Sequence, residues 1–134
     1  MKLLVIHADK FSYKVRERAL KNIDDIKEEQ RSFLTKEALV IFCTVEKKDG
    51  ERTDRLVSNA GSALESHAKV LKVEKLVIYP YAHLSSNLAS PKIAMSVLDY
   101  LKTELSNLGF DVILAPFGWY KSFEISCKGH PLSE

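Results

Sequence analysis

The fold of this chain is decided by a short apolar stretch, residues 38–45, which read ALVIFCTV. The stretch is almost continuous and rich in β-branched side chains, a pattern typical of a strand covered on both faces. The turn-forming residues 47–50, KKDG, end it. We therefore expect a central strand with other elements packed against each side.

Downstream of this strand, the pattern alternates between helices and short apolar strands. Apolar residues recur at helical spacing from about Thr53 to Leu71, which predicts an amphipathic helix. A second helix is expected after Ser90, a suitable N-cap, with Pro91 at its first position and Gly109 just past its end. The remaining strands are expected at residues 76–79, where Pro80 stops the strand, at 110–114 and at 121–127.

Upstream, the signals are weaker. Residues 3–6, LLVI, predict a buried first strand, and the alternation over residues 11–15 predicts a half-exposed second strand. A hairpin turn at Asp9 and Lys10 would join them. Residues 21–36 are polar, mix both charges and lack a clear period, which indicates a loop that can include a helical turn.

The order of elements indicates an α/β (α+β) domain, with a mixed sheet and two main amphipathic helices. The 134 residues fit a single domain, residues 1–134. Hydrophobic residues make up 46% of the chain, which is enough for a packed core and argues against disorder.

Composition also limits the possible functions. The net charge is only +2, which argues against broad binding of nucleic-acid phosphates. No apolar run approaches the roughly 20 residues that span a bilayer, and the N-terminus lacks the pattern of a signal peptide. We therefore expect a soluble, cytoplasmic protein. Cys43 and Cys127 lie in apolar or alternating runs without Cys-x-x-Cys spacing, so both are expected to be buried, unpaired thiols.

One group of candidate site residues follows the strand at 76–79. Residues 79–86 read YPYAHLSS, and ligands of α/β sheets tend to bind beyond the carboxyl ends of strands. His83 can exchange a proton near neutral pH in that position. A structural role, with the imidazole bonded to a backbone carbonyl, is the alternative.

A second group is residues 115–121, APFGWYK. Its aromatic side chains can stack on an RNA base or simply fold onto the edge of the core. In the following strand Lys121 has the same parity as Phe123 and Ile125, so it points to the apolar side. A lysine there either reaches an anion or a cleft, or extends its head into water.

A third group is residues 126–134, SCKGHPLSE. Cys127 suggests a nucleophile, but a packed thiol is the favoured interpretation. The four histidines are too scattered for metal-ligand spacing, and we predict no metal site. His67 is expected to be structural, whereas His7 and Asp9 are either site residues or part of a turn.

Together these segments resemble the N-terminal domain of archaeal threonyl-tRNA synthetases. The resemblance spans essentially the whole chain and rests on four motifs: residues 3–9 (LLVIHAD), 79–86 (YPYAHLSS), 115–121 (APFGWYK) and 125–132 (ISCKGHPL). It implies a fold like that of D-aminoacyl-tRNA deacylases, a homodimer, and a place at the N-terminal end of a longer synthetase. Trp119 stands where many members have tyrosine.

The resemblance implies editing, the hydrolysis of the ester between serine and the terminal ribose of threonine tRNA. A synthetic pocket loses only about 1–3 kcal/mol for a missing methyl, so a second, tighter pocket is needed as a double sieve. Activity on D-aminoacyl-tRNA is also implied. No cofactor is expected in this domain, whereas the full synthetase would use ATP, Mg and a zinc ion of its catalytic domain.

The resemblance also implies the site residues. The ester would be surrounded by His83, Tyr120, Lys121 and Glu134. The amino-acid and adenine pocket would be formed by backbone groups of Ala82 and Phe117 and by walls from Val45, Pro80, Pro116 and Cys127. The ribose 2′-hydroxyl itself would assist the attack, consistent with the absence of a Ser-His-Asp arrangement.

Three alternatives remain open at this point. The chain can be a free-standing D-aminoacyl-tRNA deacylase, or a non-catalytic module that binds an RNA end through its aromatic loop. A doubly wound regulatory domain would need acidic residues clustered at strand ends, and only Asp9 is so placed.

Overall fold

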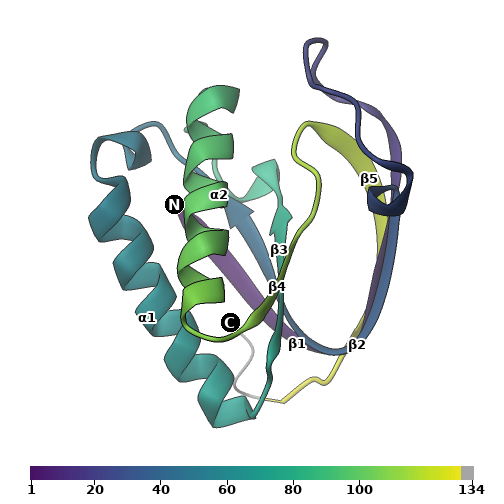
Figure 1. Cartoon of the computed structure of the whole chain (residues 1–134), viewed down its shortest axis with the longest axis vertical. Helices are drawn as coiled ribbons and strands as arrows, with labels where there is room; N and C mark the ends of the chain where they lie inside the picture. Colours follow the sequence, from purple (N-terminus) through teal and green to yellow (C-terminus); the bar gives the residue numbers. More distant parts are fainter. Residues whose placement is uncertain (131–134) are drawn as a thin grey trace.

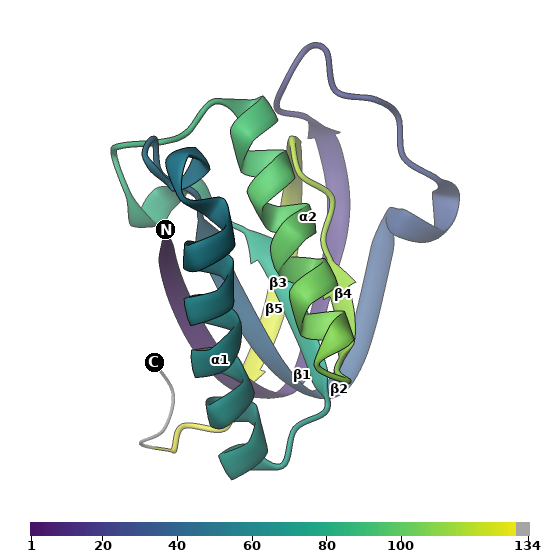
Figure 2. The ribbon, with the colours of Figure 1, turned by 60° about the vertical axis from the view of Figure 1, so that its left-hand side comes forward.

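The computed structural model describes residues 1–130. Five strands form one sheet in the order β4-β3-β2-β1-β5, and both helices pack on the same face of it (Figure 1 and Figure 2). The strands are β1 (Lys2–Arg18), β2 (Ser32–Thr44), β3 (Lys75–Pro80), β4 (Asp111–Leu114) and β5 (Trp119–Cys127). The helices are α1 (Thr53–Leu71) and α2 (Pro91–Asn107), with short 3-10 turns η1 (Glu28–Gln30), η2 (Asp49–Glu51) and η3 (Ala82–Leu84). The predicted mixed sheet with two helices is confirmed.

Strand β2 is the centre of the sheet, as its sequence predicts. It pairs antiparallel with β1 and parallel with β3. Its helix-facing side chains are Leu39, Ile41 and Cys43, and its opposite face carries Ala38, Val40 and Phe42, all of them buried. Two cores therefore meet at this strand, one beneath the helices and one on the other face.

Both helices form where the apolar spacing predicts them. In α2 the Ser90 hydroxyl accepts a hydrogen bond from the Ile93 amide at 3.4 Å, and Gly109 adopts a positive φ of 98° beyond the helix end. Their buried stripes include Leu64 of α1 and Leu101 of α2. Neither helix within residues 1–130 is long and apolar enough to cross a membrane.

The predicted hairpin at Asp9 and Lys10 is wrong, because β1 runs through both residues as one strand. Both edges of β1 are paired, with β2 on one side and β5 on the other, and these two ladders keep the backbone extended. The turn signal corresponds instead to a register shift between Ala8 and Lys10 in the pairing with β5. Such bulges bend a strand and increase its twist.

The loop predicted over residues 21–36 is shorter than expected, since β2 already begins at Ser32. Phe33 and Leu34 pair with Tyr13 and Ser12 of β1, although Leu34 is 62% exposed. This half of β2 is covered on one face only, so its composition does not resemble that of the buried half. Val45 lies one residue beyond the strand.

The sheet is strongly curled, so that β5 comes to face β2 and β3 (Figure 1). In a flat sheet β5 would lie three strand spacings, about 14 Å, from β3. Instead the Phe123 ring of β5 lies 5.4 Å from the Tyr79 ring of β3 and 5.3 Å from the Phe42 ring of β2. The second core fills this concave face.

The two cysteines differ in environment. Cys43 is 2% exposed, and burial raises its pKa to about 12. Cys127 is exposed, so the expectation that both thiols are buried is wrong for this residue. It ends β5, an edge strand of the sheet, where nothing among residues 1–130 covers it.

Candidate functional site

A pocket of about 130 Å³ opens at the carboxyl ends of β2 and β3, close to the start of α2. This volume is several times what one water molecule needs. Four of the predicted wall residues meet in it: Val45, Pro80, Ala82 and Phe117. The rest of the lining is Cys43, Thr44, Tyr81, Leu88, Ala89, Ala94 and Leu98. The structure thus unites residues from the segments at 79–86 and 115–121 with the end of the central strand.

Backbone hydrogen bonds hold the pocket walls together. The Tyr81 amide donates to the Cys43 carbonyl at 2.9 Å, and the Ala89 amide donates to the Val45 carbonyl at 3.0 Å. The Thr44 hydroxyl donates to the Tyr81 carbonyl. The segment after β3 therefore continues alongside the end of β2 and closes one side of the pocket.

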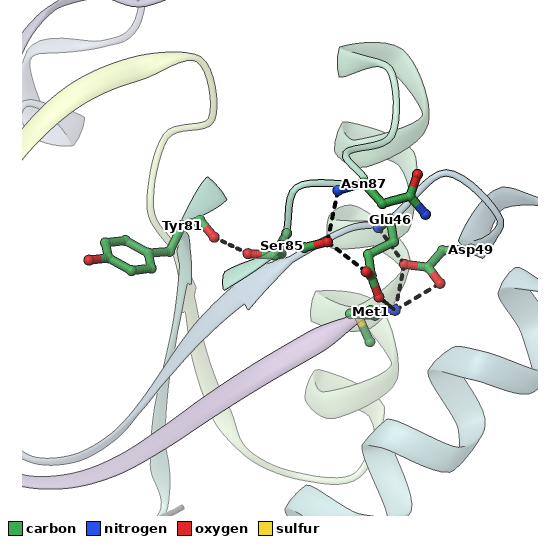
Figure 3. Close-up of polar contacts among 7 residues, drawn as sticks. Met1, Glu46, Asp49, Tyr81, Ser85 and Asn87 are labelled. Atoms are coloured by element: carbon green, nitrogen blue, oxygen red, sulfur yellow. Dashed lines mark hydrogen bonds and ion pairs between the residues drawn. The ribbon is translucent and has the colours of Figure 1, made fainter. Parts of the chain in front are cut away.

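A polar network fixes the outer rim of this segment (Figure 3). The Ser85 hydroxyl donates to Glu46 Oε2 at 2.6 Å and accepts from the Asn87 amide at 3.0 Å. The Met1 ammonium lies 3.2 Å from Glu46 Oε1 and 2.8 Å from Asp49. The Ser85 hydroxyl and this ammonium hold the pKa of Glu46 below its ordinary value. The rim is thereby attached to both η2 and the first residue of the chain.

Lys121 lies on the concave, apolar side of the sheet, as its parity predicts. Its ammonium donates to the Pro116 carbonyl at 2.6 Å and to the Trp119 carbonyl at 3.0 Å, and it lies 5.2 Å from the centre of the Tyr79 ring. Burial lowers the pKa of Lys121 to about 8. The interpretation that its head simply extends into water is therefore wrong. An ammonium has three N–H donors, and two are used here, so one remains for another acceptor.

The aromatic core explains why Lys121 is desolvated. Tyr79 packs against Phe11, Tyr13, Phe42 and Phe123, with ring centres 5.4 to 6.0 Å apart. Burial among these rings raises the pKa of Tyr79 to about 12. The tyrosine is thus neutral, and it presents a ring face, rather than a negative charge, to the lysine.

The turn that carries Phe117 is anchored by the loop between β1 and β2. Both the Ala19 and the Leu20 amides donate to the Gly118 carbonyl, at 2.9 and 3.3 Å. Gly118 has a φ of +85°, and a Cβ there would lie 2.9 Å from Ile23 Cδ1. Only glycine fits this turn without backbone strain and a shift of the Ile23 side chain.

Trp119 folds onto the core edge instead of offering a surface for base stacking. It is 7% exposed, and the guanidinium carbons of Arg18 and Arg31 lie 4.8 and 5.5 Å from its ring centre. Of the two interpretations of this aromatic loop, the structure favours the structural one for Trp119.

His83 is exposed in η3, directly after the pocket residue Ala82. Its ring meets the Tyr81 ring edge to face, with centres 5.0 Å apart. Within residues 1–130 its imidazole forms no hydrogen bond to a backbone carbonyl, so the purely structural role is not observed. His83 is therefore an exposed chain neighbour of the pocket residue Ala82.

Five described residues among the predicted site residues do not line this pocket in one copy of the chain: His83, Pro116, Tyr120, Lys121 and Cys127. Tyr120 is 60% exposed and, by the alternation of β5, faces away from the side of Lys121. Cys127 lies six residues along β5 from Lys121, about 20 Å at the rise of a strand. Glu134 lies outside the described residues.

His7, at the end of the first apolar run, lies outside the pocket. His7 Nδ1 lies 2.9 Å from His130 Nε2, and His7 pairs with Leu39, four residues before the pocket residue Cys43. Asp9 pairs with Lys128. These contacts attach the segment after β5 to β1, so neither His7 nor Asp9 contributes to the pocket.

Sequence reasoning missed several pocket residues, of which Ala94 and Leu98 are the clearest. Both belong to the apolar stripe of α2 and were expected only in the core. A usable signal was present: Ser90 and Pro91 define the helix start, and residues four and eight after the cap face the carboxyl ends of the strands. The contact of Met1 with Glu46 and Asp49 has no comparable signal in the sequence.

Chemically, the arrangement is a small, mainly apolar pocket, with a desolvated ammonium bonded to the turn that carries its Phe117 wall and an exposed histidine directly after its Ala82 wall. An ammonium in such surroundings stabilises developing negative charge on an oxygen more strongly than it does in water. The arrangement therefore suits polarisation of a carbonyl group.

Comparisons with known proteins place this chain in a family. The whole chain, residues 1–134, matches the family described as the archaea-specific editing domain of threonyl-tRNA synthetase. The chain is also similar to proteins named threonine–tRNA ligase: it is 46% identical over 134 residues to that of Thermococcus gammatolerans, 46% to that of Methanosphaera stadtmanae and 47% to that of Methanothrix thermoacetophila. Each match covers 100% of this chain but 21% or 22% of the relative, so the chain spans about a fifth of their length. The resemblance seen in the sequence is confirmed: this chain belongs to the family of archaea-specific editing domains of threonyl-tRNA synthetase.

Proposed function

We propose that this chain hydrolyses the ester that joins serine to the terminal ribose of threonine tRNA. The observation that carries the proposal is the desolvated ammonium of Lys121, held with one N–H to spare by the carbonyls of Pro116 and Trp119, on either side of the pocket residue Phe117. Membership of the editing family supplies the reaction class. No cofactor takes part in the proposed step.

In this step a water molecule attacks the carbonyl carbon of the serine ester. The bond between that carbon and the ribose 3′-oxygen breaks, the 3′-oxygen takes up a proton, and serine leaves as its carboxylate. The free N–H of Lys121 donates to the carbonyl oxygen as charge develops on it. The ribose 2′-hydroxyl assists by orienting and activating the water, so no strongly basic side chain is needed.

The remaining predicted residues have positioning roles in the proposal. His83, next to the pocket residue Ala82, orients the water or the ribose. The side chains of Val45 and Pro80 bound the pocket that admits serine. Threonine carries one further methyl, and a rigid wall rejects it by steric clash rather than by weaker attraction, which is the logic of a double sieve. Esters of D-amino acids are proposed as further substrates.

The proposal includes a homodimer. Tyr120 and Cys127 cannot line the pocket of their own copy, and β5 forms an open edge of the sheet with Phe123 37% exposed. A second copy placed against this edge would cover the exposed ring and bring these residues to the partner's site. Sedimentation equilibrium is expected to give twice the mass of one chain, and a monomer would remove this part of the proposal.

The test of the function is a deacylation assay. The chain is incubated with threonine tRNA charged with labelled serine or labelled threonine, and loss of label is followed over time. Release of serine alone supports editing. Binding without release would instead favour a non-catalytic RNA-end module, and release restricted to D-amino acids would favour a D-aminoacyl-tRNA deacylase.

Two perturbations test the mechanism within this assay. Lys121→Met is expected to slow serine release at least about ten-fold, equivalent to about 1.4 kcal/mol of barrier. Lys128→Met, which changes the lysine directly after the far end of β5, is the matched control and should have little effect. A tRNA whose terminal ribose lacks the 2′-hydroxyl should not be deacylated, and full activity on it would exclude assistance by the substrate.

A further inference from the structure

A second pocket, of about 210 Å³, lies directly beside the first. The two pockets share Leu98 and Phe117 in their linings, so they are neighbours. The rest of its lining is Gln30, Met95, Asp99, Lys102, Leu114, Ala115 and Pro116. None of these groups except Pro116 has a role in the proposed ester hydrolysis.

The second pocket has one apolar wall, and polar groups from two separate elements line the rest of it. Pro116 and Phe117 supply the apolar side. Asp99 and Lys102 lie three residues apart on α2, on the same face of the helix. Gln30 reaches in from the loop between β1 and β2, and its Oε1 accepts from the Lys27 amide at 2.9 Å, which orients the carboxamide.

The two charged groups of the rim are available to a ligand. Within residues 1–130 neither Asp99 nor Lys102 takes part in an ion pair, although they lie on the same helical face. The ammonium of Lys102, the carboxylate of Asp99 and the carboxamide of Gln30 surround an apolar wall. These groups are chemically complementary to a single unpaired nucleotide. Its base offers a flat face and a hydrogen-bonding edge, and its phosphate offers a negative charge.

We propose that the second pocket receives the nucleotide that precedes the terminal adenosine of the tRNA. This inference rests on the proposed function, in which the first pocket receives the aminoacylated end. The next nucleotide of a single strand must then lie in the adjacent space, and a shared wall places the second pocket there. The base packs on the half-buried Phe117, Gln30 and Asp99 meet its edge, and Lys102 contacts the phosphate.

The modest net charge of the chain fits this assignment. A surface that follows a long stretch of RNA needs clustered basic residues, whereas one nucleotide needs one cation. The chain would therefore recognise the tip of the acceptor strand through two neighbouring subsites.

The experiment compares two minimal substrates, the 3′-seryl esters of adenosine and of the dinucleotide cytidylyl-adenosine. They differ only by the nucleotide assigned to the second pocket. The unaltered chain is expected to hydrolyse the dinucleotide ester with a KM at least about three-fold lower. Lys102→Gln and Gln30→Ala should each remove this advantage and leave the adenosine ester unaffected. Both side chains are exposed, so the fold is expected to persist.

Lys69→Gln, an equal change of charge on the exposed face of α1, is the matched control and should retain the advantage. If the variants raise KM equally for both esters, the second pocket binds the terminal adenosine itself. If KM is unchanged for both, the pocket binds no part of the RNA. Either result overturns this inference and leaves the proposed function standing. If the unaltered chain hydrolyses neither ester nor the charged tRNA, the proposed function fails and this inference fails with it.

Discussion

Replacing Lys121 by methionine should change the stability of the fold in a way that depends on pH. In the folded chain the pKa of Lys121 is about 8, whereas the ordinary value is 10.5. Each pKa unit corresponds to about 1.4 kcal/mol, so below pH 8 the buried charge costs the folded state about 3 kcal/mol. Methionine has a similar length and carries no charge, so the variant lacks this cost.

The direction in which the free energy of unfolding changes with pH follows from proton binding. Between pH 8 and 10.5 the unfolded chain keeps the proton of Lys121 while the folded chain has lost it, so the stability of the unaltered chain rises with pH. The advantage of Lys121→Met is full below pH 8 and declines above it. About 2 kcal/mol of that advantage should disappear between about pH 7 and about pH 9.5. The hydrogen bonds lost with Lys121 add an offset that changes little with pH.

The assay is urea unfolding of both proteins at a series of pH values, followed by circular dichroism. The measured quantity is the difference between the two free energies of unfolding. Lys128→Met is the control: ion pairs with Asp9 and Glu37 raise the pKa of Lys128, so its contribution stays constant over this pH range. A difference for Lys121→Met that is flat from about pH 7 to about pH 9.5 would refute the argument that this ammonium is desolvated.

Three further outcomes are expected. Gly118→Ala should lower the free energy of unfolding by about 1–3 kcal/mol, because φ is +85° and the new Cβ meets Ile23. Gly109→Ala is the control: its φ is +98° and the space around it is open, so its loss of stability measures the backbone strain without a steric contact. Alkylation of the native chain should modify Cys127 but not Cys43, and mass spectrometry showing two adducts would contradict the burial of Cys43. The ratio of serine release by the unaltered chain to that by Lys121→Met should fall above about pH 8, since the ammonium then loses its proton.

Much of this fold follows from local sequence. The buried half of β2 needs apolar side chains on both faces, and α2 needs its cap at Ser90 and its stripe of apolar residues, so both elements are visible as patterns. The parity of β5 likewise predicts the side to which Lys121 points. The four motifs were also sufficient to identify the family.

The parts that sequence reasoning missed depend on partners distant in the chain. The turn signal at Asp9 is overridden because β2 and β5 pair with both edges of β1 there, and no local pattern reports such pairing. The exposure of Cys127 depends on β5 forming an edge of the sheet, which is a property of strand order.

The sequence by itself determined most of the elements, the family and the segments that carry the candidate residues, because those depend on side-chain periodicity and on short motifs. Only the tertiary structure decided which of these residues share a pocket. The curl of the sheet brings Lys121 over Tyr79 across three strand spacings, and the shared wall at Leu98 and Phe117 joins two pockets. Both arise from packing between segments far apart in the chain, where the burial of one side chain depends on the positions of all the others.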